Sequence, residues 1–134
     1  KECILQPQSE PDKVRAFLLQ EGFFFIEEDM VEEDGKYYPM FRCVPCADNS
    51  AWDNMDETTV TVCDLYGPVL IKNGNPVLRK FLVREHHKLA AIMQQLRTQD
   101  MSDSIMDRIE QINEMMAYNE AAYSTMGAIR NAGI

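Results

Sequence analysis

The sequence has 134 residues, of which 46% are hydrophobic and 26% charged, a composition typical of a globular protein. The chain carries 13 basic and 22 acidic residues, and its net charge of -9 argues against nucleic-acid binding over its whole surface. It contains no apolar run long enough to span a membrane and no signal peptide, so we expect a soluble, cytoplasmic protein without a membrane partner.

The first predicted element is a short buried strand at Cys3–Gln6. Ser9 is placed to cap a following helix, Pro11 suits its first turn, and apolar residues at helical spacing continue to Leu19. Gly22 provides a stop signal. A buried strand needs neighbours and covering helices, and this chain supplies few of them. The start of the chain is therefore typical of the C-terminal part of a larger α/β domain.

A β-hairpin is predicted next, because two strand-like runs flank Asp34-Gly35. Met30 supplies an apolar face in the first strand, for which we expect a bulge around Asp29. Pro39 cannot donate a backbone hydrogen bond, so we expect its strand to be interrupted or to lie at an edge of the sheet. We expect the acidic cluster from Glu27 to Asp34 to form a solvated strand face.

Cysteines stand at positions 3, 43, 46 and 63, and Cys43 and Cys46 have the spacing of half a zinc site or of a redox pair. A structural zinc site needs four ligands, and the chain has no second close pair. A thioredoxin-like pair opens a helix, whereas this one ends a predicted strand. We therefore expect reduced cysteines and no metal.

The middle of the chain contains a polar excursion at 45–57, a short β-prone run at 58–63 and a turn-rich connector at 65–77. Two amphipathic helices are predicted after it. Their seams are formed by residues at alternating steps of four and three, at Leu78, Leu82, Glu85, Leu89, Ile92 and Leu96, then at Ile105, Ile109, Ile112, Met116, Asn119 and Tyr123. The short loop between them offers a Ser or Asp cap, so we expect an antiparallel helical hairpin with coiled-coil-like packing. Glu85 and Asn119 are polar intrusions that either fix the register or lie at the margin of the contact.

Two segments, "CILQPQSEPDKVRAFLLQEGFFFIEEDMVEEDGKYYPM" and "LYGPVLIKNGNPVLRKFLVRE", resemble the bacterial TrmK-type tRNA (adenine-N1)-methyltransferases. The match covers about residues 3–44 and 65–97, and the helical pattern agrees to about residue 125. The resemblance implies an α/β fold, the C-terminal part of a Rossmann-like class I methyltransferase sheet, followed by an antiparallel helical coiled-coil hairpin. The implied division is residues 1–64 for the methyltransferase part and 65–134 for the connector and hairpin.

The resemblance also implies an activity, the S-adenosylmethionine-dependent methylation of adenine 22 of tRNA at N1. In that layout Cys3–Gln6 is the fifth strand of the sheet, and the Asp34-Gly35 hairpin forms the sixth and seventh, the seventh antiparallel. Gln6, Pro7 and Gln8 then lie on the target-base side, because ligands bind beyond the carboxyl ends of such strands. A plain strand-to-helix turn, in which the amides satisfy backbone groups, is the alternative. The family commonly has Asn in place of Gln8 and Glu in place of Pro39.

The cofactor-binding elements of that family have no counterpart here, because none of the six glycines forms a nucleoside-cradling loop. By resemblance they lie upstream of Lys1, in an N-terminal half that acts as partner to this chain. We therefore expect the chain alone to bind S-adenosylmethionine poorly and to transfer no methyl group. Adenine N1 carries its own lone pair, so positioning can suffice, and we assign no catalytic residue.

Residues 72–88 differ from the acidic remainder of the chain, because five basic residues accompany one acidic residue, Glu85, and the pair His86-His87. The basic residues are Lys72, Arg79, Lys80, Arg84 and Lys88. Together with the resemblance, this cluster predicts contact with tRNA phosphates. Taken alone, the cluster favours a solvated helix face with ion pairs such as that between Lys80 and Glu85.

A non-enzymatic function is the competing prediction. The same two helices can form a homo-oligomer or a protein-binding hairpin anchored by a small sheet. This alternative explains the acidic balance of the chain directly. Binding of tRNA that depends on Arg79, Lys80 and Arg84 distinguishes the two predictions.

Overall fold

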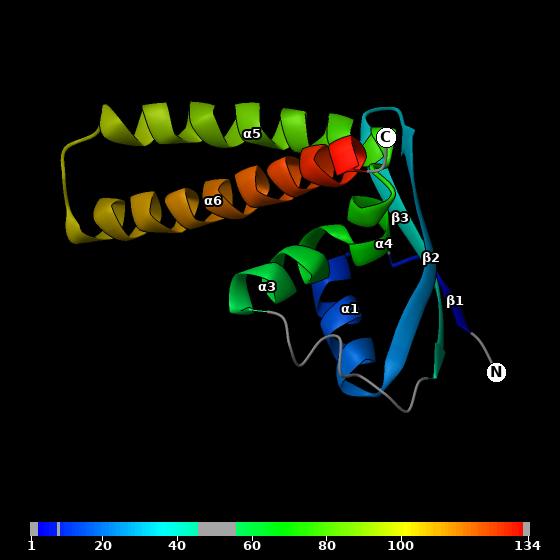
Figure 1. The fold of residues 1–134 in the computed structure, drawn as a ribbon. Coiled ribbons are helices and arrows are strands. Elements are labelled where there is room, and N and C mark those ends of the chain that lie inside the picture. Colours follow the sequence, from blue (N-terminus) through cyan, green and yellow to red (C-terminus); the bar gives the residue numbers. More distant parts are fainter. Residues whose placement is uncertain (1–2, 8, 46–55, 133–134) are drawn as a thin grey trace.

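The computed structural model describes residues 3–7, 9–45 and 56–132, with side chains described as far as Met126. The elements in chain order are β1 (Cys3–Leu5), α1 (Pro11–Gln20), β2 (Phe23–Glu33), β3 (Lys36–Pro45), α3 (Glu57–Tyr66), α4 (Pro68–Lys72), α5 (Pro76–Arg97) and α6 (Asp103–Ala132). A three-stranded sheet is covered on one side by α1, α3 and α4, and the long helices α5 and α6 project away from it (Figure 1). The predicted α/β class is confirmed. None of the described helices could cross a membrane.

The strand order is β1-β3-β2, and β3 is antiparallel to both neighbours, as the resemblance implied. β1 and β2 are therefore parallel to each other. The predicted hairpin at Asp34-Gly35 is confirmed, with Glu33 opposite Lys36. The bulge lies at Ile26, so the expected position around Asp29 is wrong.

Pro39 occupies an unexpected position, because β3 is a continuous central strand. β1 pairs only with Phe41, Arg42 and Cys43, while Pro39 pairs with Met30 of β2. Among the described strands, β3 therefore has a single neighbour at Pro39. A proline is tolerated there because that stretch of the strand is locally an edge.

The helix that follows β1 begins with Pro11, but Ser9 does not cap it. Glu10 is the N-cap residue, in the left-handed region at a φ of 47°, with no side-chain cap bond. Because the helix begins at Pro11, the N-cap position falls on Glu10, and Ser9 stands one residue before it. Gly22, at a φ of 83°, ends the helix as predicted.

The segment predicted to be β-prone, 58–63, forms part of α3, so that prediction is wrong. The Asp56 side chain accepts a hydrogen bond of 2.6 Å from the backbone N–H of Thr59 and caps the helix. Val62, Cys63 and Tyr66 then share one buried face. The connector predicted at 65–77 contains α4, and the predicted domain boundary after residue 64 falls inside α3.

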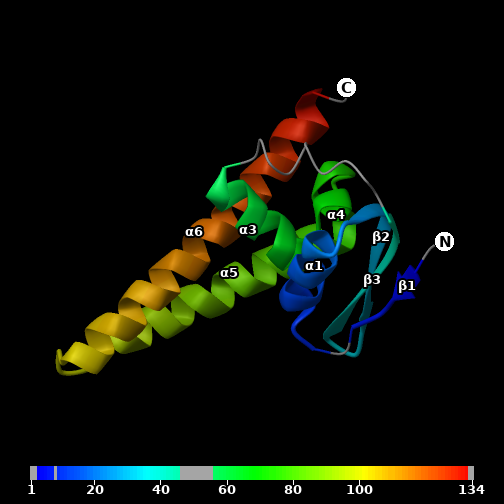
Figure 2. The ribbon, with the colours of Figure 1, turned by 90° about the horizontal axis from the view of Figure 1, so that it is seen from below.

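The two predicted long helices are confirmed, and they run antiparallel, side by side (Figures 1 and 2). The backbone N–H of Ile105 donates a hydrogen bond of 3.3 Å to Ser102 Oγ, which is the expected type of cap. Leu89, Met93, Leu96 and Ile112 form the buried contact at the far end of the pair. At the near end, α5 and α6 share a core with β2, α3 and α4.

Candidate nucleic-acid interface

A buried ion pair fixes the base from which α5 projects. Arg15 of α1 donates a hydrogen bond of 3.0 Å from Nε to Glu28 Oε1 of β2, and the two side chains are 1% and 0% exposed. Arg15 Nη1 also donates to the carbonyl oxygens of Asp64 (3.0 Å) and Leu65 (3.1 Å), in the last turn of α3. The guanidinium thus satisfies carbonyl groups that a helix end leaves without intrahelical partners.

The other oxygen of Glu28 caps the next helix. Glu28 Oε2 accepts hydrogen bonds from the backbone N–H groups of Val69 (2.6 Å) and Leu70 (3.3 Å), in the first turn of α4. Burial raises the pKa of Glu28, and the Arg15 charge opposes that shift. Burial likewise lowers the pKa of Arg15, and the Glu28 carboxylate opposes it. We call this ion pair with its bonds to both helix ends the Arg15–Glu28 junction.

Gly67 connects the two helices at this junction, in the turn Tyr66-Gly67-Pro68. Its φ of 97° disfavours other residues, and a Cβ atom there would lie 2.8 Å from Glu28 Oε1 and 3.0 Å from Arg15 Nη2. Pro68 is the first residue of α4. The prediction of a fully solvated acidic face on β2 is therefore wrong at Glu28, which is buried against this turn.

A second polar cluster holds the two long helices against α3. Asn119 Nδ2 of α6 donates to the Leu82 carbonyl (2.9 Å) and to Glu85 Oε1 (3.0 Å) of α5. The Tyr66 hydroxyl donates to the same carboxyl oxygen of Glu85 at 2.6 Å. Glu85 and Asn119, the two polar residues predicted in the seams, therefore bond to each other and fix the register of α5 against α6. The bond from Tyr66 attaches this pair of helices to α3. Burial raises the pKa of Tyr66, as does its bond to Glu85.

The predicted basic cluster is divided between solvent and the β2–β3 hairpin. Lys80 Nζ lies 2.5 Å from Glu32 Oε1, with 65% of its side chain exposed. Arg84 donates to the Gly35 carbonyl, and its guanidinium lies 5.7 Å from the centre of the Tyr37 ring. The predicted pairing of Lys80 with Glu85 is wrong, because Lys80 turns to the hairpin. We call Arg79, Lys80 and Arg84 the α5 basic surface.

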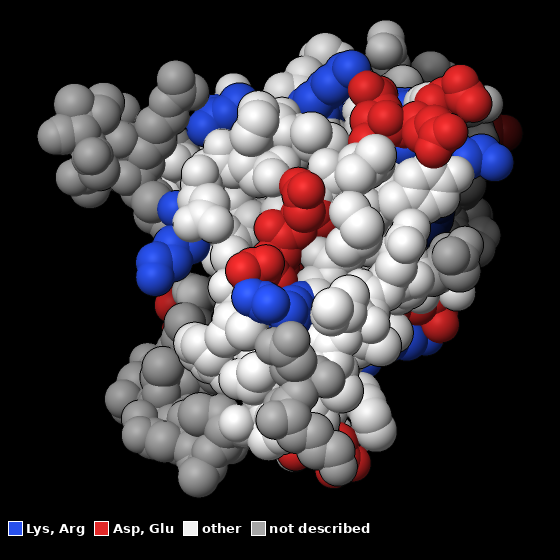
Figure 3. Space-filling model, turned by 90° about the vertical axis from the view of Figure 1, so that its right-hand side faces the viewer, with Lys and Arg blue, Asp and Glu red and all other residues white. Residues whose placement is uncertain are grey.

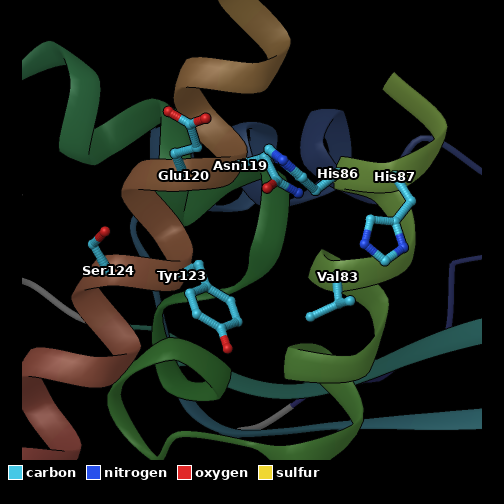
Figure 4. Close-up of a pocket in the computed structure, with 7 residues that line it drawn as sticks. All are labelled: Val83, His86, His87, Asn119, Glu120, Tyr123 and Ser124. Carbon is cyan, nitrogen blue, oxygen red and sulfur yellow. The ribbon is translucent and has the colours of Figure 1, made fainter. Parts of the chain in front are cut away.

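Two adjoining hollows lie beside this surface and share Val83, His87 and Tyr123. The first, between α5 and α6, has a volume of about 320 Å³, and we call it the α5–α6 groove. It is lined by Val83, His86, His87, Asn119, Glu120, Tyr123 and Ser124 (Figure 4). The second has a volume of about 570 Å³ and is lined by the whole α5 basic surface. The groove therefore opens beside three cationic side chains.

The remaining predicted site residues take different positions. Lys88 is exposed and lines a further hollow with Arg84, whereas Lys72, at the end of α4, lines none of the hollows found beside α5. Gln6 is exposed and Pro7 is half-buried just after β1, while Gln8 lies outside the described residues.

The strand register relates Gln6 and Pro7 to α5. β1 runs from opposite Cys43 to opposite Phe41, that is, toward the hairpin turn. Gln6 and Pro7 therefore leave β1 toward the turn of the hairpin, but β1 ends opposite Phe41, whereas β3 begins at Lys36 next to that turn. The register thus gives the direction in which Gln6 and Pro7 leave the sheet, and α5 contacts the hairpin farther along that direction.

The outer face of the sheet has a different character (Figure 3). Residues without charge predominate there, acidic and basic side chains are interspersed, and Arg42 pairs with Glu27 at 2.6 Å. Ile4 of β1 is 74% exposed. A mixed surface of this kind does not favour a polyanion, so α5 is the better candidate for contact with nucleic acid.

The cysteines described by the structure are free thiols. Cys3 stands opposite Cys43, and burial raises the pKa of Cys43 and that of Cys63, the latter to about 11. A raised pKa makes the Cys43 and Cys63 thiols poor nucleophiles. Cys46, the second member of the predicted pair, lies outside the described residues.

Sequence reasoning missed three residues that shape this region. Arg15 lies three residues before the buried Leu18, and a charged residue on the apolar side of a helix is a signal for a buried partner. Gly67 before Pro68 marks a turn that needs glycine. Tyr123 was predicted as a seam residue, but it is 41% exposed and faces the groove.

Comparison with known proteins agrees with this architecture. The family model described as TrmK, tRNA (adenine(22)-N(1))-methyltransferase, matches residues 1–120. A curated relative of that description from Bacillus subtilis (strain 168) is 27% identical over 120 residues, which cover 84% of this chain and 49% of the relative. The chain thus spans about half the length of the curated relative it matches.

Solved structures extend the likeness to three dimensions. The crystal structure of the B. subtilis m1A22 tRNA methyltransferase TrmK superimposes with a TM-score of 0.76 at 24% identity, covering 92% of this chain and 51% of that one. A Streptococcus pneumoniae protein solved in complex with S-adenosyl-L-methionine gives a TM-score of 0.56 at 25% identity, with coverages of 87% and 47%.

Proposed function

The chain belongs to the TrmK family of tRNA (adenine(22)-N(1))-methyltransferases, and on that premise we propose that it is the C-terminal portion of an S-adenosylmethionine-dependent enzyme of this kind. In this proposal residues 1–64 complete the methyltransferase sheet and residues 65–134 form a connector and a coiled-coil hairpin that contacts tRNA. The coverage of about half of the B. subtilis relative supports the assignment to a portion of the enzyme. S-adenosylmethionine is then bound mainly by an N-terminal half that is the partner of this chain.

Gln6, Pro7 and Gln8 supply the target-base side of the active site in this proposal. Gln6 and Pro7 follow β1, whose carboxyl end points in the same direction as that of the parallel strand β2. Ligands of open α/β sheets bind beyond such ends. Amide groups can read the edge of an adenine that has left its stack. The residues would orient N1 toward the methyl group, and no general base is needed for a nitrogen with a free lone pair.

The hairpin contacts the RNA through α5. The α5 basic surface, together with Lys72 and Lys88, is proposed to meet phosphates. Lys80 and Arg84 are exposed, and their present partners are a carboxylate and a backbone carbonyl at the surface. Such surface contacts are weak and exchange readily for a phosphate. The observation that carries the proposal is the register of β1, since it directs Gln6 and Pro7 toward the end of the sheet that bonds to α5.

The test is binding of a tRNA transcript by the chain and by the triple variant Arg79→Glu, Lys80→Glu, Arg84→Glu, measured across a salt series. We expect the wild-type affinity to fall with salt, and the triple variant to bind at least about tenfold more weakly with a shallower salt slope. Unchanged binding by the triple variant would contradict a tRNA-contacting α5. Self-association without tRNA binding would instead favour the oligomerisation function.

A methyl-transfer assay tests separately whether S-adenosylmethionine is bound by the N-terminal half and not by this chain. We expect no transfer from S-adenosylmethionine to tRNA by the chain alone, and transfer when the sequence upstream of Lys1 is restored. In the restored protein, Gln6→Ala should lower the rate while leaving cofactor binding intact. Transfer by the isolated chain would refute the assignment of the cofactor site to the other half.

A further inference from the structure

Tyr123 is an exposed aromatic residue of α6, and neither the packing of the two long helices nor contact with phosphates explains its exposure. It lies on α6 with 41% of its surface exposed, and it faces Val83 and His87 of α5 across the groove (Figure 4). Arg79 of the α5 basic surface stacks over it, with the guanidinium carbon 5.4 Å from the ring centre. Although Tyr123 stands at a seam position of the helical pattern, its ring is partly open to solvent and carries a stacked guanidinium.

Arg79 is the second unusual group at this site. Its Nη2 atom is buried and has no hydrogen-bond partner among the described residues. A buried donor without an acceptor costs free energy, and such a group in a groove marks a place where a ligand oxygen can bind. The Arg79 side chain, half-buried as a whole, lines the hollow that adjoins the groove, so a ligand in that hollow would lie beside the guanidinium.

The walls of the groove restrict the class of ligand. The groove is lined by one aromatic ring and two imidazoles, and the Arg79 guanidinium lines the adjoining hollow; unstacked bases of single-stranded RNA pack on groups of these kinds. Lys80 and Arg84 stand at the adjoining hollow, where a backbone phosphate would lie. The groove has a volume of about 320 Å³, is open to solvent and lies between elements held together by the Asn119–Glu85 bond. Duplex RNA keeps its bases stacked inside and cannot place one there.

We propose that the α5–α6 groove binds one unstacked nucleotide of the RNA, with its base against Tyr123 and its phosphate at Arg79 and Lys80. This inference rests on the proposed contact of α5 with tRNA and adds a single-stranded element to it. The site is distinct from the target-base side at Gln6, because it lies between the two long helices.

The experiment compares a labelled oligouridine with a fully paired RNA hairpin of equal length, each titrated with the chain. We expect Tyr123→Ala to weaken oligouridine binding about fivefold to hundredfold, the range for loss of one stacked base, and to leave hairpin binding nearly unchanged. Tyr123→Phe keeps the ring and should retain the affinity. With 5-iodouridine in the oligonucleotide, we expect a photo-crosslink at Tyr123.

A second variant, on the opposite wall of the groove, tests the inference independently of Tyr123. Val83 is 39% exposed on the opposite wall, so Val83→Phe should fill the groove without disturbing the core, and should weaken oligouridine binding in the same way. If either variant melts as wild type and binds oligouridine as wild type, the inference is overturned. If Arg79→Glu, Lys80→Glu, Arg84→Glu abolishes tRNA binding while both groove variants bind oligouridine normally, this inference fails and the proposed function stands. Unchanged tRNA binding by the triple variant defeats the proposed function itself.

Discussion

Two ion pairs attach β2 to helices, and they differ in their exposure to solvent. Arg15–Glu28 is almost wholly buried, at 1% and 0% exposure, and each partner makes further bonds to helix ends. Lys80–Glu32 joins the same strand to α5, but its side chains are 65% and 27% exposed. The first belongs to the fold, because its charges have no access to water. The second keeps its lysine available to another anion.

This difference shows why counting charges along the chain is a poor guide to binding. Removing one partner of a buried pair strands a charge in an apolar interior, at a cost of several kcal/mol. An exposed pair contributes about 0–1 kcal/mol to stability, so little free energy is lost when a phosphate replaces its carboxylate. We therefore expect stability to depend on the Arg15–Glu28 junction and binding to depend on the α5 basic surface.

Breaking the buried pair should have the largest effect. Arg15→Met leaves the Glu28 carboxylate buried without its cation and removes the bonds to the Asp64 and Leu65 carbonyls. We expect a loss of about 3–5 kcal/mol in the free energy of unfolding, measured by urea denaturation. Lys80→Met is the matched control, and we expect it to unfold at nearly the wild-type urea concentration because its ion pair is exposed. Equal losses in the two variants would remove the distinction between the pairs.

The turn at the junction gives a second, smaller test. Gly67→Ala adds a Cβ at a φ of 97°, within 3 Å of both Glu28 oxygens, and should cost about 1–3 kcal/mol. Gly74→Ala is the control, because its φ of 61° is also positive but no atom lies within 4 Å of the added Cβ. Thermal melting of both variants should show the larger shift for Gly67→Ala. A larger shift for Gly74→Ala would mean that crowding at the ion pair is unimportant.

The smallest expected effect concerns Asp64, next to the junction. Burial raises its pKa to about 6 from the ordinary 3.8, against the opposing charge of Arg15, so the folded state holds its proton to a higher pH than the unfolded state. The folded protein therefore loses stability through this group as the pH rises from about 4 to about 6. Asp64→Asn should raise stability by less than about 1 kcal/mol at about pH 7.5 and have no effect near pH 3. Urea midpoints at the two pH values check this, and a gain that persists at the lower pH would contradict it.

Local patterns predicted the parts of the fold that local physics decides. Asp34-Gly35 fixed the hairpin, because both residues take a positive φ there, at 53° and 78°. The alternating steps of four and three identified α5 and α6, and Glu85 and Asn119 were correctly expected in their seams. These signals depend on residues within a few positions of one another.

Non-local contacts decided the elements that were missed. Residues 58–63 are rich in Thr and Val and favour a strand, but the Asp56 cap and the burial of Val62 and Tyr66 stabilise a helix. Glu28 has an acidic neighbour on either side and pairs with a residue 13 positions away and with backbone groups about 40 positions away. No short pattern contains those partners.

The candidate site was predicted only in part, because local patterns identify its residues but do not place them relative to one another. The basic residues of α5 were evident from their clustering within residues 72–88, and Tyr123 was evident as a helical residue from the seam pattern. Their grouping around a groove depends on the register of α5 against α6, and the partners of Lys80 and Arg84 depend on where the β2–β3 hairpin ends. That placement is a property of the assembled fold.

The most direct test of the account uses two lysines in matched surroundings. Lys80 pairs with Glu32 and Lys13 with Glu10, the lysine side chains are 65% and 71% exposed, and the adjacent carboxylate raises the pKa of each lysine. We would measure tRNA affinity for Lys80→Glu and Lys13→Glu across a salt series. If α5 contacts tRNA, Lys80→Glu weakens binding several-fold and lowers the salt slope by about one, while Lys13→Glu binds as wild type. Equal losses, or no loss in either variant, would contradict a tRNA interface on α5.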